Sequence, residues 1–118
     1  MIKNLSDLIV AARSRGPATL AVAAAEDAEV IEAVREVASL GLANAILVGD
    51  EASILTLAGE AGLPRGARII REPDPKLASL AAARLVRQGE ASLLMKGAVN
   101  TSDFLRAALD AENGLRSG

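Results

Sequence analysis

The residues best suited to chemistry lie in one segment near the end of the chain, which reads Lys96-Gly97-Ala98-Val99-Asn100-Thr101-Ser102-Asp103. A lysine follows an apolar run, a glycine lets the backbone come close to a ligand, and three small polar residues open a helical pattern. Positive charge, hydroxyl donors and the free N–H groups of a helix start are the components of an anion or phosphate site. A structural interpretation stays open, in which Asn100 or Thr101 only caps the helix and Lys96 is solvated.

Acidic residues follow the other apolar runs of the chain. Glu26 and Asp27 could bind a metal ion or a ribose hydroxyl group, but the position of Asp27 favours capping of the next helix. Asp50 and Asp74 stand at equivalent positions, and the proline that follows Asp74 is typical of a first helical turn. Capping is therefore the preferred interpretation of all three aspartates.

The composition excludes several classes of function. The 118 residues include no histidine and no cysteine, which removes thiolate chemistry, Ser/His or Cys/His nucleophile pairs, and zinc sites of the ordinary type. A net charge of −2 with one aromatic residue, Phe104, gives no basic patch or stacking platform for nucleic acid. The apolar runs are too short to span a membrane. We expect one cytoplasmic α/β domain over residues 1–118, with no metal, nucleic-acid or membrane partner.

Short apolar runs alternate with helical patterns along the chain. Four runs that are apolar on both faces predict central strands of a mainly parallel sheet, namely Thr19 to Ala24, Ala45 to Val48, Ala67 to Ile70 and Ser92 to Met95. Helical spacing predicts a leading helix over Leu5 to Arg15, an amphipathic helix over Asp27 to Leu40, and two further helices capped by Asp50 and Asp74. A last helix is predicted over Ser102 to Ala111, with Phe104, Leu105, Ala108 and Leu109 on its buried face. Glycines 16, 41, 62 and 89 are expected to end helices. The order predicts a three-layer α/β/α fold.

In such a fold, ligands bind beyond the carboxyl ends of the strands. Four loops follow the predicted strands, and they are the expected functional edge; they begin at Ala25, Gly49, Glu72 and Lys96.

The segment from Leu94 to Asp110, followed by Gly114 to Gly118, resembles the phosphate acetyl/butyryltransferase family. The strand–loop units at Val22 to Asp27, Ala45 to Asp50 and Glu72 to Pro75 are similar to the same family, and the Lys96-Gly97 pair resembles its butyryl branch. The resemblance implies transfer of an acyl group between coenzyme A and inorganic phosphate, with coenzyme A as a substrate and no bound cofactor or metal. It also implies a fold like that of the isocitrate and isopropylmalate dehydrogenases, in which a cleft lies between two α/β domains, and a homodimer.

The resemblance implies that the substrate-binding residues on this side of the cleft are Lys96, Gly97, Asn100, Thr101, Ser102, Arg106 and Arg116. Members of the family are considerably longer than this chain, and their catalytic residues lie in the later part. We therefore expect a truncated portion with no catalytic residue of its own, inactive alone. A phosphoacceptor receiver-like signalling domain and a non-catalytic domain that binds coenzyme A or phosphate remain alternatives.

Overall fold

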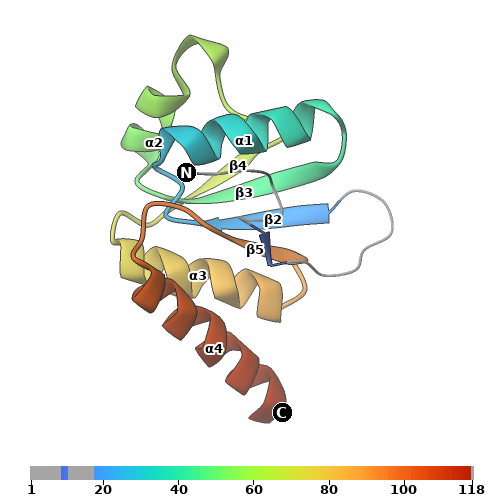
Figure 1. The fold of residues 1–118 in the computed structure, drawn as a ribbon, viewed down its shortest axis with the longest axis vertical. Helices are drawn as coiled ribbons and strands as arrows, with labels where there is room; N and C mark the ends of the chain where they lie inside the picture. The colour runs from blue at the N-terminus through green and yellow to red at the C-terminus, as the bar shows by residue number, and fades with distance from the viewer. Residues whose placement is uncertain (1–8, 11–17, 118) are drawn as a thin grey trace.

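The computed structural model describes residues 9–10 and 18–117, and the side chains of residues 18–110. Within these residues, strands and helices alternate as the hydrophobic pattern predicts (Figure 1). The elements are β1 (Ile9–Val10), β2 (Ala18–Ala23), α1 (Ala28–Ser39), β3 (Ala43–Gly49), α2 (Glu51–Ala58), the 3₁₀ turn η2 (Gly59–Ala61), β4 (Arg68–Arg71), α3 (Pro75–Arg87), β5 (Leu93–Lys96) and α4 (Thr101–Ser117).

The strands form one sheet in the order β1-β5-β2-β3-β4. The four strands from β2 to β5 are parallel to one another, and they coincide with the four predicted strands to within two residues at each end. The predicted leading helix is wrong at Ile9–Val10, which instead pair antiparallel with β5. Pairing with the edge of a formed sheet overrides a local helical pattern there; the rest of that predicted helix, and Gly16, lie outside the described residues.

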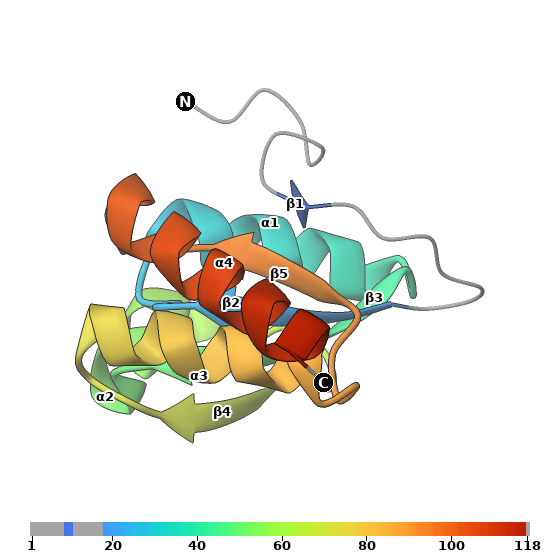
Figure 2. The same cartoon turned by 90° about the horizontal axis from the view of Figure 1, so that it is seen from below.

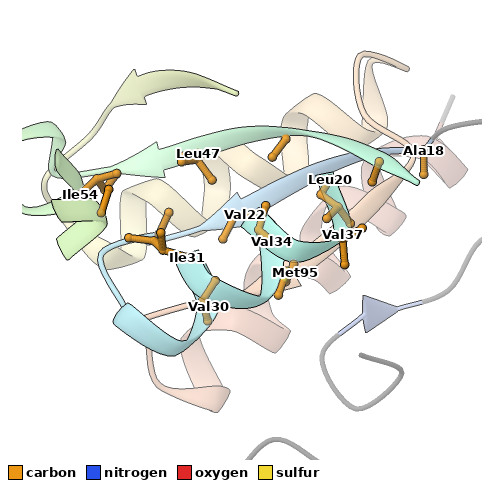
Figure 3. Packing of buried hydrophobic residues seen from close by; sticks show 14 residues of the cluster. Ala18, Leu20, Val22, Val30, Ile31, Val34, Val37, Leu47, Ile54 and Met95 are labelled. Atoms are coloured by element: carbon orange, nitrogen blue, oxygen red, sulfur yellow. The ribbon is translucent and has the colours of Figure 1, made fainter. Parts of the chain in front are cut away.

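The sheet is covered on both faces, which confirms the three-layer prediction (Figure 1). Right-handed connections explain the arrangement: the chain moves from β2 through β3 to β4 with α1 and α2 on one face, then returns across the sheet with α3 on the other. Alternate residues of each strand serve the two faces. Leu20, Val22, Leu47 and Met95 pack under α1 and α2, as Figure 3 shows, whereas Ala21, Ala23, Ile46, Val48 and Leu94 pack under α3 and α4.

Local signals set the ends of the helices. Asp27, Asp50 and Asp74 each accept hydrogen bonds from first-turn N–H groups, so the predicted caps are confirmed. Gly41 and Gly89 follow α1 and α3 with φ of 73° and 82°, a region that glycine adopts without steric strain. Gly62 follows the 3₁₀ turn rather than α2 itself, because α2 already ends at Ala58 and Gly59 is its C-cap.

The last helix, α4, is longer than predicted, and one part of its predicted buried face is wrong. Phe104 is buried and Ala108 is partly buried, but Leu105 and Leu109 are 51% and 58% exposed, and Ala107 is buried although it was not predicted to be. The reason is that α4 packs chiefly on α3 rather than on the sheet (Figure 2). Contact with a single helix buries only a narrow stripe, and the two leucines lie beside that stripe.

Candidate active-site edge

The four loops that follow the parallel strands lie at one edge of the sheet. Strand β2 has β5 on one side and β3 on the other, so the chain reverses direction across the sheet between β2 and β5. In open α/β sheets, ligands bind in the crevice at such a switch point. The two loops beside it are β2–α1, which contains Glu26, and β5–α4, which contains Gly97.

Gly97 holds these two loops together. Its N–H group donates to the carbonyl oxygen of Ala23 at 2.9 Å, and the N–H of Ala98 donates to that of Ala24 at 2.6 Å. A β-carbon at position 97 would overlap the Ala24 carbonyl oxygen and lie 2.7 Å from that of Ala23. The close backbone approach expected at this glycine is therefore an approach to β2, and its N–H group is already occupied.

The start of α4 combines a cap with unoccupied donors. Asn100 Oδ1 accepts from the N–H of Asp103 at 2.7 Å, and its Nδ2 donates to the Asp103 carboxylate at 2.9 Å. Thr101 and Ser102 are exposed, and their first-turn N–H groups have no acceptor within residues 18–110. Asn100 thus acts as the helix cap, while Thr101 and Ser102 offer both N–H and hydroxyl groups to an anion.

Lys96 is the last residue of β5 and is partly buried. Strand alternation places its side chain on the same face as Leu94, the face covered by α3 and α4. Within the described part of the chain its ammonium group forms no ion pair. A loop of four residues, from Gly97 to Asn100, connects this cationic residue to the positive end of α4.

Ser102 and Arg106 meet a residue that the sequence analysis did not select. Together with Lys76 they line a groove of about 540 Å³ between α3 and α4, which also contains leucine side chains and the carboxylates of Asp103 and Asp110. Pro75 indicated that Lys76 lies in the first turn of a helix. Only the packing of α3 on α4 brings Lys76 into the same groove as Arg106. Lys96, Gly97, Asn100 and Thr101 do not line this groove.

Arg116 is separated from these residues. It lies in the last turn of α4, about 22 Å from Thr101 at the usual rise per residue, and its side chain is outside the described set. The structure therefore does not bring Arg116 to the β5–α4 loop.

The acidic residues of the edge are mostly committed to local structure, since Asp27, Asp50 and Asp74 are caps. Glu26 differs, because its Oε1 atom is buried without a hydrogen-bond partner.

Within the described ranges, no cluster of three potential metal ligands is found. The helices in those ranges are also too short or too polar to cross a membrane.

Comparison with known proteins gives a consistent result, although no protein-family model matches the chain. A phosphate butyryltransferase of Clostridium acetobutylicum is 44% identical over 100% of this chain and 40% of its own length. One from Clostridium beijerinckii is 41% identical over 100% of the chain and 39% of its own length.

This chain is homologous to the phosphate acetyl/butyryltransferases. A phosphate acetyltransferase of Rhizobium meliloti is also 37% identical over 93% of the chain and 35% of its own length. Proteins named for both acyl types, butyryl and acetyl, are thus similar to this chain. The chain spans about two fifths of the length of the two butyryltransferases.

A solved structure supports the fold. The branched-chain phosphotransacylase from Enterococcus faecalis V583 superposes with a TM-score of 0.63 over 80% of this chain and 33% of its own, at 18% sequence identity. The α/β architecture described above is therefore shared with this structure.

Proposed function

We propose that this chain forms one side of the substrate cleft of an acyltransferase that moves butyryl or a similar short acyl group between coenzyme A and inorganic phosphate. The observation that carries the proposal is the β5–α4 loop, which connects Lys96 at the end of β5 to the unoccupied first-turn N–H groups of α4. The similarity to phosphate butyryltransferases over the whole chain supports the same reaction.

The chemistry of the edge explains what this side of a cleft would contribute. Inorganic phosphate is held by the ammonium group of Lys96 and by the N–H and hydroxyl groups of Thr101 and Ser102. Lys76 and Arg106 in the groove bind phosphate groups of coenzyme A. Phosphate is a weak nucleophile in water, so positioning it against the thioester lowers the barrier. We assign no catalytic acid or base to this chain, because its edge aspartates are caps.

The assembly and location of the enzyme belong to the same proposal. Residues 1–118 act as a single α/β domain, and the enzyme works as a homodimer in the cytoplasm, without a bound cofactor, nucleic acid or membrane. A net charge of −2 and a sequence with one aromatic residue support the absence of a nucleic-acid partner.

Titration of the chain with inorganic phosphate, followed by amide NMR, tests the proposal. We expect shifts in residues 96–102, and we expect Lys96→Ala to weaken phosphate binding about tenfold, as for loss of one charge-assisted hydrogen bond. Arg65→Ala is the matched control, because it removes an equal charge from an exposed loop before β4, at the opposite edge.

Equal phosphate affinity in the two variants would remove Lys96 from the site. With butyryl-CoA and phosphate, we expect the chain alone to release no coenzyme A, because one side of a cleft supplies only part of the required contacts. Release above the background would contradict the assignment of the catalytic groups to residues outside this chain.

A further inference from the structure

Strand β4 leaves one edge of the sheet open. The strand order ends at β4, so within the described residues no strand pairs with its outer side (Figure 2). Arg68 and Arg71 are exposed, and Ile69 and Ile70 are only partly buried, whereas most residues of β2 and β3 are buried. An open edge of this kind is a template on which another strand can pair.

The parallel ladder with β3 shows which backbone groups are free at this edge. The N–H group of Glu72 donates to the carbonyl oxygen of Gly49 at 2.8 Å, and Arg71 is the residue in register with Gly49. Successive residues of a strand direct their backbone groups to opposite sides. The N–H and C=O groups of Ile70 and Glu72 therefore point toward β3, while those of Ile69 and Arg71 point outward.

The residues along this edge are self-complementary under a two-fold axis at Ile70. Such an axis makes an antiparallel pair, in which Ile69 lies opposite Arg71 of the second copy. These are the residues with outward backbone groups, and each opposed pair exchanges two hydrogen bonds. Arg68 then lies opposite Glu72 of the second copy, so that a pair of opposite charges stands at each end of the hydrogen-bonded segment.

The neighbouring registers lack this match. Outward residues must face outward residues, so the axis can also pass through Ile69 or through Arg71. An axis at Ile69 leaves Arg71 opposite Ala67, which lies outside β4. An axis at Arg71 places the two Arg71 side chains opposite each other, and like charges directly opposed are destabilising. The charges along the edge thus select the register at Ile70.

We propose that two copies of this chain associate through their β4 edges, antiparallel about Ile70, and form one continuous sheet. The inference rests on the homodimer named in the proposed function and adds the surface that forms it, and it does not depend on the proposed reaction. An edge this short buries less than the roughly 800 Å² per partner of a standard interface. The dimer should therefore dissociate on dilution.

Sedimentation velocity over a range of protein concentrations tests the inference, and we expect the dimer fraction to rise with concentration. Arg68→Glu should raise the dissociation constant about tenfold, because two attractive pairs become repulsive. Glu90→Gln is the matched control: it removes the partner of Arg68 within the chain, at 3.5 Å, and leaves the edge unchanged. The double variant Arg68→Glu/Glu72→Arg should restore the dissociation constant, since each charge again faces its opposite.

A second pair of variants tests the backbone hydrogen bonds. Arg71→Pro removes the outward N–H group and keeps the bonds between β4 and β3, so it should raise the dissociation constant about tenfold. Arg71→Ala removes the same side chain but keeps the N–H group, and it should leave the dimer in place. Circular dichroism should show that both variants remain folded; if Arg71→Pro unfolds, the charge exchange at positions 68 and 72 decides.

The outcomes separate this inference from the proposed function. A chain that stays monomeric at every concentration overturns the inference. A dimer with the same dissociation constant in Arg68→Glu and Glu90→Gln also overturns it, because association then uses another surface and only the homodimer itself stands. Neither result alters the titration of residues 96–102 with inorganic phosphate, which decides the proposed phosphate site independently.

Discussion

Gly97 lies against the backbone carbonyl group of Ala24, at the point where β5 and β2 leave the sheet. Ala24 has a φ of 58°, in the left-handed region that residues with a side chain rarely adopt, and in this conformation its carbonyl oxygen accepts from Ala98. The two loops beside the switch point are thus joined by backbone hydrogen bonds. The position of Lys96, one residue earlier, depends on this junction.

Gly97→Ala should therefore destabilise the protein strongly. The new methyl group would overlap the Ala24 carbonyl oxygen, so the β5–α4 loop must move away from β2 and lose its hydrogen bonds. We expect a loss of about 3 kcal/mol in the free energy of unfolding, as for severe overpacking of a core. Urea denaturation followed by circular dichroism measures this change.

Gly89→Ala is the control for that prediction. A β-carbon at Gly89 meets no atom within 4 Å, but the backbone has a φ of 82°. Gly89→Ala should therefore lower the free energy of unfolding only by the strain of an alanine in the left-handed conformation, about 1 kcal/mol. If the two variants lose the same free energy of unfolding, crowding against Ala24 is not the reason for a glycine at position 97.

Arg35 joins α1 to the end of α2. Its Nε and Nη2 atoms donate to the Gly62 carbonyl oxygen at 3.1 and 2.8 Å, and Nη2 also donates to that of Ala58 at 3.0 Å. We expect Arg35→Ala to lower the free energy of unfolding by about 2 kcal/mol, because two partly buried carbonyl groups lose a charged donor. Thermal and urea unfolding provide the measurement.

Two further variants make this prediction specific. Arg35→Lys keeps the charge but lacks the planar fork, so most of the loss should remain. Arg84→Ala removes an exposed arginine from α3 and should change stability by less than about 0.5 kcal/mol. If Arg35→Ala left the free energy of unfolding unchanged, α1 and the end of α2 would be held together by apolar packing alone.

The correction to the buried face of α4 gives a third prediction. Phe104 is 5% exposed and packs in the cluster beneath α3, whereas the adjacent Leu105 is 51% exposed. Phe104→Ala should lower the free energy of unfolding by about 3 kcal/mol, and Leu105→Ala should change it by less than about 0.5 kcal/mol. Similar losses in the two variants, measured by urea unfolding, would restore the face predicted from the sequence.

The sequence by itself determined the order of the elements from β2 to α4, their capping residues, and the edge of the sheet at which the loops after the parallel strands gather. These features depend on short-range physics: the period of apolar residues, the oxygen of an aspartate within reach of the next N–H groups, and the freedom of a glycine at a positive φ. The positions of Asp27, Asp50 and Asp74 were predicted correctly for this reason. The segment at Ile9–Val10 was predicted wrongly because its strand forms only by pairing with β5, far away along the chain.

Only the tertiary structure decided which residues meet. Lys76 and Arg106 share a groove because α3 packs on α4, and the Glu26 carboxylate lies on Gly49 because β2 pairs with β3. The same packing assigned Gly97 to the junction with β2 and left Leu105 exposed. Contacts of this kind depend on distances between segments remote in sequence, and no local pattern of residue types encodes them.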